Sequence, residues 1–165
     1  MILIASDHAA FDLKQHLVAF LKEMHHEVHD LGVERVESVD YPDFAHRLAE
    51  GIQRGDAVQG ILICGTGLGM SMAANRHAGI RAALCHDAYT AAMARKHNDA
   101  NVLCLGARVL GAGVVEQIVR VFLSTAFEGG RHQRRGDKIE REKRQEIEPR
   151  RHEERKTGLK SRLGT

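Results

Sequence analysis

The feature that most constrains this chain is a regular alternation of short apolar runs with amphipathic segments over its first 130 residues. The apolar runs contain no alternating polar positions, which is typical of strands buried on both faces. The segments between them repeat apolar residues at helical spacing. The sequence therefore predicts a doubly wound, Rossmann-like α/β domain, a five-stranded parallel sheet with helices on both faces. We expect strands at residues 1–6, 27–31, 60–64, 81–85 and 102–105, and helices at 9–24, 41–54, 69–75, 89–97 and 113–124.

Charge divides the 165 residues into two parts. The first 130 residues carry 11 basic and 15 acidic side chains, whereas the last 35 carry 13 and 7. We expect the α/β domain to cover 1–135 and a charged C-terminal extension to cover 136–165. A short helix up to Pro149 is expected there, with Ile139 and Ile147 facing a partner, and partial disorder beyond it. Nucleic-acid binding is not expected, because acidic residues are mixed into the extension and aromatic residues are absent from it.

Composition excludes several other classes of protein. No apolar run approaches the roughly 18 residues of a membrane span, and the N-terminus lacks the basic start of a signal peptide. The three cysteines are an odd number without CxxC spacing, which argues against disulfides and for the reducing cytoplasm. The histidines show no HExxH or other metal spacing, so we expect no metal site.

A glycine-rich loop is the most informative segment. Gly65, Gly67 and Gly69 follow an apolar run and precede a short helix. Such a loop can turn sharply and aim several backbone N–H groups at one point, which suits a phosphate or an oxyanion. The P-loop pattern is absent, and Met70 occupies the place of the third glycine in a dinucleotide-binding motif. The alternative is a tight strand-to-helix connection without a ligand.

Cys64 ends the apolar run just before this loop. The N-terminal end of a helix favours the thiolate form of a nearby cysteine, so Cys64 could act as a general base or a nucleophile. The alternative is a small buried apolar side chain, which is how most free cysteines behave. We favour that alternative for Cys85 and Cys104, which lie in or beside apolar strands.

Further polar residues are expected at the same edge of the sheet. Asp7 and His8 follow the first strand, where they could pass protons or hold a sugar hydroxyl, although Asp7 could simply cap the first helix. His97 and Asn98 end the fourth predicted helix, and a histidine suits acid–base chemistry near neutral pH, although it could equally be a surface residue.

A cationic patch follows the glycine pair at 129–130. Arg131 and Arg135 are four residues apart, with Arg134 beside them, so a helix would place two guanidinium groups on one face. That arrangement suits phosphate binding, and the alternative is a solvated charged helix.

Taken together, these segments resemble a known family. DHAAFDLK at 7–14, DYPDFA at 40–45, GILICGTGLGMSMAANR at 60–76, GIRAALC at 79–85, RKHNDANVLCLGARV at 95–109 and FEGGRHQRR at 127–135 are similar to ribose-5-phosphate isomerase type B. The wider family includes galactose-6-phosphate and allose-6-phosphate isomerases. The likeness covers residues 1–135 in order.

The resemblance implies an aldose–ketose isomerase of the pentose phosphate pathway that works without metal or other cofactor. It would interconvert ribose 5-phosphate and ribulose 5-phosphate through an enediolate, with Cys64 as the base. Thr66 and His97 match the pair that assists opening of the sugar ring. Met70 stands where another branch of the family uses a glutamate, which places this chain in the cysteine-type branch. The positions that match substrate-binding residues are Asp7, His8, Tyr41, Gly65, Thr66, Gly67, Leu68, Gly69, Asn98, Arg108, Arg131 and Arg135.

The resemblance also implies a homodimer or tetramer, with active sites shared across the subunit interface. Two alternatives remain open from the sequence. One is an isomerase of a hexose 6-phosphate of the allose or galactose type. The other is a non-catalytic module that binds a phosphate or a nucleotide.

Overall fold

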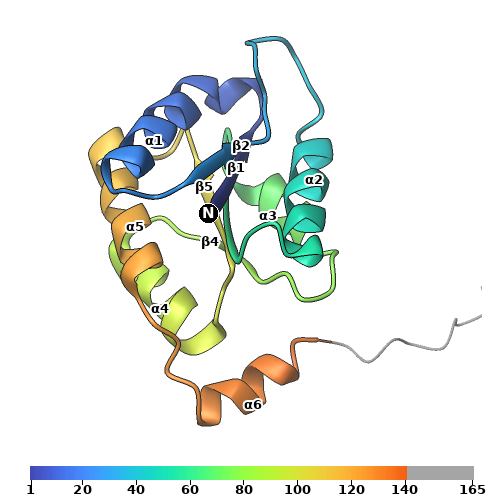
Figure 1. Cartoon of the computed structure of the whole chain (residues 1–165), viewed down its shortest axis with the longest axis vertical. Coiled ribbons are helices and arrows are strands. Elements are labelled where there is room, and N and C mark those ends of the chain that lie inside the picture. The colour runs from blue at the N-terminus through green and yellow to red at the C-terminus, as the bar shows by residue number, and fades with distance from the viewer. Residues whose placement is uncertain (141–165) are drawn as a thin grey trace, which may run out of the picture.

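The protein is a three-layered α/β domain with one parallel sheet (Figure 1), in a computed structural model that describes residues 1–140. The strand order is β2-β1-β3-β5-β4. The strands are β1 (Ile2–Ser6), β2 (Val28–Asp30), β3 (Gln59–Cys64), β4 (Ala82–Leu84) and β5 (Val102–Gly106). The helices are η1 (His8–Ala10), α1 (Phe11–Glu23), α2 (Tyr41–Arg54), α3 (Leu68–Ala74), α4 (Ala88–Asn98), α5 (Ala112–Ser124) and α6 (Arg131–Asp137). The predicted five-stranded fold is confirmed.

Helices cover both faces of the sheet. Helices α1, α4 and α5 pack on one face and α2 and α3 on the other (Figure 1). Side chains of successive strand residues pack against opposite helix layers. Ile61 faces α1, α4 and α5, whereas Leu62 faces α2 and α3. Every residue of β1 and β5 is therefore buried, which explains why these runs are apolar except for Ser6. The Ser6 hydroxyl donates a hydrogen bond to the carbonyl of Asp7 at 3.0 Å.

The direction of the strands gives the sheet two unlike edges. All paired strands are parallel, so their C-terminal ends meet at one edge, which we call the carboxyl edge. The returning helices run the opposite way and end at the other edge, which we call the amino edge. Helix α6 lies at the amino edge beside the end of α4, far from η1 (Figure 1).

A buried ion pair joins α1 to the edge strand β2. The Lys14 side chain is almost wholly buried, and its Nζ lies 2.6 Å and 2.7 Å from the two carboxylate oxygens of Asp30. Asp30 also accepts a hydrogen bond from the backbone N–H of Gly32 at 2.9 Å. Burial of an ammonium group is tolerated when it is paired and hydrogen-bonded in this way.

The C-terminal extension is described only at its start. Helix α6 ends at Asp137, and Ile139 is exposed in the turn that follows. The expected continuation of the helix to Pro149, the role of Ile147 and the expected disorder beyond Pro149 fall outside the described residues. Within residues 1–140, every helix is too short or too polar to cross a bilayer.

Candidate active site

The glycine loop is shaped by close approaches that exclude side chains. Gly67 has a positive φ of 78°, and a Cβ atom there would lie 2.5 Å from a methyl group of Leu84. Gly106, at the end of the neighbouring strand, lies so close to the loop that a Cβ would be 2.8 Å from the carbonyl oxygen of Thr66. Both positions therefore require glycine, and the loop is held tightly against the end of β5.

Cys64 faces this loop from the end of β3. Its side chain is buried, and its Sγ accepts a hydrogen bond from the backbone N–H of Gly67 at 3.1 Å. Helix α3 begins at the next residue, Leu68, so the start of that helix lies beside the sulfur. An N–H donor and a helix N-terminus both stabilise a thiolate, which is the form that takes a proton or attacks carbon. Cys64 is thus buried in the α2–α3 layer and hydrogen-bonded to the loop at the same time.

The other two cysteines are placed differently. Burial, with a smaller contribution from the charge of Asp87, raises the pKa of Cys85 to about 11 against the opposing effect of a hydrogen bond with Thr90. Burial also raises the pKa of Cys104 far above its usual value. Both thiols stay protonated near neutral pH, in line with the expectation that they are structural residues.

Asp7 and His8 lie beside Cys64, on the neighbouring strand end. Ser6 pairs with Ile63 in the sheet, so Asp7 emerges next to Cys64. The Asp7 carboxylate accepts a hydrogen bond from the N–H of Ala9 at 3.0 Å, which confirms its capping role. The Nδ1 atom of His8 accepts a hydrogen bond from the N–H of Val39 at 3.3 Å. In its neutral form His8 therefore carries its proton on Nε2 and can donate it to a ligand.

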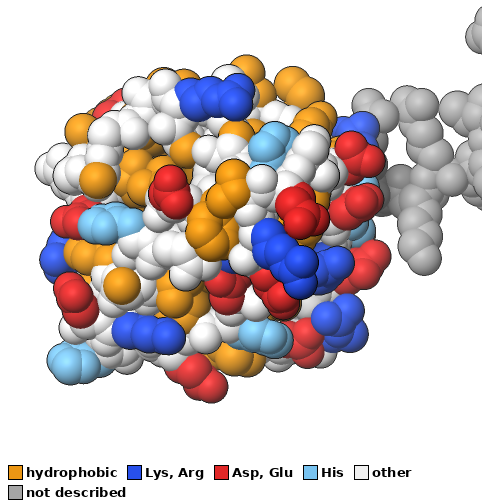
Figure 2. All heavy atoms as spheres, turned by 90° about the horizontal axis from the view of Figure 1, so that it is seen from above, with side chains coloured by type: hydrophobic (Ala, Val, Ile, Leu, Met, Phe, Trp, Pro, Cys, Tyr) orange, Lys and Arg blue, Asp and Glu red, His pale blue; other side chains and the backbone are white. Residues whose placement is uncertain are grey.

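Two further side chains cover the loop. The Tyr41 ring packs so closely on Gly69 that a Cβ there would lie 2.8 Å from the phenolic oxygen. The Arg108 side chain packs over Gly65, and its own backbone N–H donates to the Gly65 carbonyl at 3.0 Å. Thr66 and Leu68 are exposed on the loop itself. Figure 2, which looks onto the carboxyl edge, shows apolar, basic and acidic side chains interspersed over this face.

The expected position of His97 and Asn98 beside Cys64 in the same chain is wrong. Helix α4 runs opposite to the strands, so its last residues lie at the amino edge. Arg131 and Arg135 on α6 also lie there, because α6 packs on α4. The predicted site residues thus form two groups at opposite edges of one chain.

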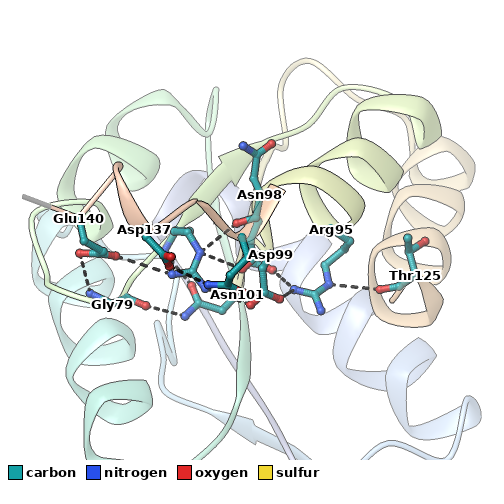
Figure 3. A network of polar contacts seen from close by, with 11 residues as sticks. Gly79, Arg95, Asn98, Asp99, Asn101, Thr125, Asp137 and Glu140 are labelled. Atoms are coloured by element: carbon teal, nitrogen blue, oxygen red, sulfur yellow. Dashed lines mark hydrogen bonds and ion pairs between the residues drawn. The ribbon is translucent and has the colours of Figure 1, made fainter. Parts of the chain in front are cut away.

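Salt bridges fix the end of α4. Asp99 pairs with Arg81 at 3.1 Å and with Arg95 at 2.9 Å, and the backbone carbonyl of Asn98 accepts from Arg81 at 2.9 Å. Glu140 reaches this region from beyond α6 and accepts a hydrogen bond from the N–H of Gly79 at 3.3 Å. Figure 3 shows this network, with the Asn98 side chain pointing away from it. A cavity of about 550 Å³ opens between Asn98 and Glu140.

Two residues beside His97 were not expected to contact it. The rings of His97 and His132 are stacked, with centroids 4.2 Å apart and planes 5° from parallel. The Glu128 carboxylate lies 3.9 Å from Nε2 of His97 and 3.6 Å from Nε2 of His132. Helical spacing does not indicate this cluster in the sequence, because Glu128 lies on the segment before α6.

The cluster contains metal-binding residue types, since the ligand atoms of His97, Glu128 and His132 lie within 4.8 Å of one another. However, a histidine binds a metal along a lone pair in its ring plane. Two nearly parallel planes cannot direct those lone pairs to one point, so the observed arrangement is a ring stack and not a metal-binding geometry.

Comparisons with known proteins agree on one family. The family model described as "Ribose/Galactose Isomerase" matches residues 2–139. The relative named "Ribose-5-phosphate isomerase B" from Escherichia coli is 46% identical over 138 residues, which is 84% of this chain and 93% of that protein.

Solved structures give the same result. The ribose-5-phosphate isomerase B of Clostridium thermocellum has a TM-score of 0.83 and 51% identity, over 84% of this chain and 93% of the other. The ribose 5-phosphate isomerase of Thermotoga maritima has a TM-score of 0.83 and 54% identity, over 84% and 96%. The chain therefore belongs to the ribose/galactose isomerase family and is an isomerase.

Proposed function

We propose that the protein interconverts ribose 5-phosphate and ribulose 5-phosphate, because the relatives from E. coli, C. thermocellum and T. maritima are named ribose-5-phosphate isomerases. The observation that carries the proposal is the thiol of Cys64 beside a glycine loop whose Gly67 backbone N–H is directed at the sulfur. Proton transfer next to a carbonyl needs a base and a place for negative charge on oxygen. Cys64 and the glycine loop that follows it offer both the base and the place for negative charge.

Ring opening comes first, because ribose 5-phosphate is mostly a closed furanose. The bond between C1 and the ring oxygen breaks, the anomeric hydroxyl loses its proton to become an aldehyde, and the ring oxygen takes up a proton. His97 donates the proton that the ring oxygen takes up, and Thr66 assists removal of the proton from the anomeric hydroxyl. A histidine is suited to this step because it can hold or release a proton near neutral pH.

Isomerisation follows on the open chain. The Cys64 thiolate removes the proton from C2, and the electron pair forms the C1–C2 double bond of an enediolate. The negative charge on O1 is stabilised by the N–H groups of the loop from Gly65 to Gly69. The proton on O2 moves to O1, Cys64 returns its proton to C1, and the keto group of ribulose 5-phosphate forms at C2.

Two copies of the chain assemble the site. In one chain Cys64 and His97 lie at opposite edges of the sheet, yet the reaction needs both near the same sugar. The carboxyl edge also exposes apolar side chains, namely Tyr41, Leu68 and Val109, which a second copy could cover. We propose a homodimer in which Arg131 and Arg135 of one copy bind the phosphate near Arg108 of the other. A tetramer could be built from two such pairs.

The three free thiols suit a reducing compartment such as the cytoplasm.

The test is an isomerase assay with ribose 5-phosphate in the presence of EDTA. Wild type should remain active, and Cys64→Ala should lose activity by about 10³-fold or more, because the base is gone. Cys85→Ala is the matched control and should stay within a few fold of wild type. A Cys64→Ala variant that turns over at the wild-type rate would refute the role of the thiol.

A hexose 6-phosphate is the second candidate substrate, because the matching family includes galactose isomerases. The same assay with ribose 5-phosphate, allose 6-phosphate and galactose 6-phosphate distinguishes them. A higher kcat/KM for either hexose phosphate would replace the pentose assignment while leaving the chemistry unchanged.

A further inference from the structure

The stacked histidines form a small, well-defined unit at the amino edge. His97 is the last but one residue of α4, and His132 lies in the first turn of α6. Their rings are nearly parallel at a centroid distance of 4.2 Å. Stacked rings restrict each other's rotation, so the orientation of His97 depends on the ring beneath it.

The two rings differ in their exposure. The His132 side chain is only 7% exposed, whereas that of His97 is 40% exposed. Burial lowers the pKa of His132, and the nearby charges of His97, Arg131 and Arg135 lower it further, while Glu128 opposes them. His132 therefore stays neutral at neutral pH.

The Glu128 carboxylate lies beside the edges of both rings. Its carboxylate lies within 4 Å of each Nε2 atom, and its own backbone N–H donates to the carbonyl of Lys96 at 3.1 Å. The Lys96 ammonium lies 3.7 Å from the other carboxylate oxygen. The charged and titratable groups around His97 are thus Lys96 on α4, Glu128 on the connecting segment, and His132, Arg131 and Arg135 on α6.

We propose that His132 is a positioning residue whose buried, flat ring holds His97 in the orientation needed to open the sugar ring. The inference rests on the proposed function, because it assigns His97 to ring opening. His132 touches His97 and is not required to touch the sugar. Its loss should therefore slow ring opening and leave the proton transfer by Cys64 intact.

The two steps can be measured separately because the two sugars differ in form. Ribose 5-phosphate enters as a furanose and needs ring opening. Ribulose 5-phosphate carries its phosphate on the hydroxyl that a furanose would use, so it enters as an open chain. Exchange of its C1 hydrogen with D2O, followed by NMR, therefore reports on Cys64 alone.

The experiment compares His132→Leu with His132→Phe in the full chain. His132→Leu removes the flat ring, and we expect kcat for ribose 5-phosphate to fall about tenfold or more, while the exchange rate stays within about twofold of wild type. His132→Phe keeps a flat ring, and we expect it to recover most of the lost kcat. Thermal unfolding of both variants checks that the fold is retained.

Three outcomes would overturn the proposal. The first is an equal fall of kcat and exchange, which would indicate general damage to the site. The second is a rise in KM for both sugars, which would assign His132 to phosphate binding. The third is a Phe variant as slow as the Leu variant.

Two controls accompany the comparison. His16→Leu removes another histidine that lies beside a glutamate, since His16 is 2.8 Å from Glu116 on the surface, and both rates should be unchanged. Cys64→Ala should lose both rates. If Cys64→Ala kept its exchange rate, the proposed function would fail whatever the His132 variants show.

Discussion

The two edges of the sheet hold their functional residues by different means. At the carboxyl edge backbone contacts position the site residues. Gly67 and Gly106 allow main-chain segments to approach closely, and Cys64 is hydrogen-bonded to a backbone N–H. At the amino edge side-chain contacts position the residues, through stacked rings at His97 and ion pairs at Asp99. An edge built from backbone is rigid and tolerates few substitutions, whereas an edge built from polar side chains can be adjusted one contact at a time.

The largest expected effect tests whether the two edges meet between subunits. Cys64→Ala and His97→Asn should each be inactive alone. When they are unfolded and refolded together, half of the dimers are mixed, and each mixed dimer has one site with both residues intact. We therefore expect activity to return to about a quarter of wild type, by random pairing of two subunits. The measurement is the ribose 5-phosphate assay before and after mixing.

A matched mixture provides the control for this experiment. Cys64→Ala refolded with Cys64→Ser should stay inactive, because neither chain supplies the base. Activity that fails to return in the mixture of Cys64→Ala with His97→Asn, although mixed dimers are present, would mean that both residues act within one chain.

The next effect tests the rigidity of the carboxyl edge. Gly67→Ala places a methyl group 2.5 Å from Leu84 and forces a non-glycine residue into a positive φ. We expect a loss of about 2–4 kcal/mol in the free energy of unfolding and a large loss of activity. Gly113→Ala is the control, since a Cβ there meets nothing within 4 Å. Urea denaturation measures both, and an unchanged midpoint for Gly67→Ala would contradict a tightly packed loop.

Sequence reasoning was accurate where a local pattern determines the structure. The apolar runs predicted β1, β3, β4 and β5, and β1, β3 and β5 are almost wholly apolar because they are buried on both faces. Strand β2 is mostly polar and exposed, and only its place in the alternation predicted it. The same reasoning placed Cys64 at a strand end beside the glycine loop. Strand β4 proved shorter than expected, since it lies at the edge of the sheet and only one side is paired.

The remainder could not be predicted because it depends on contacts between distant residues. The contact of His97 with His132 joins positions 35 residues apart, and the Lys14–Asp30 pair joins two elements through a buried charge. His97 was placed at the wrong edge because its motif was interpreted by its chemistry and not by the direction of its helix. A helix that follows a parallel strand ends at the opposite edge, which would have corrected the prediction.

A smaller effect compares the rates at which Cys64 and Cys85 react with an alkylating reagent. Burial raises the pKa of Cys85 to about 11, so only about one molecule in a thousand carries that thiolate at pH 8. We expect iodoacetamide to label Cys64 at least tenfold faster than Cys85 in the native protein, and ribose 5-phosphate to protect Cys64. Peptide mapping by mass spectrometry gives the two rates, with denatured protein as the control. Faster labelling of Cys85 would contradict the contrast between the two sulfurs.

The smallest effect concerns the stability of the amino edge in mild acid. Burial keeps the pKa of His132 below its usual value of 6.5, so the folded protein binds fewer protons at this site than the unfolded chain as the pH falls below about 6.5. Stability therefore decreases from pH 7.5 toward pH 5, and His132→Phe should remove this part of the decrease. We expect the drop in Tm between pH 7.5 and pH 5 to be smaller in His132→Phe than in wild type. Equal drops in wild type and His132→Phe would mean that the buried ring takes up its proton as readily in the folded protein as in the unfolded one.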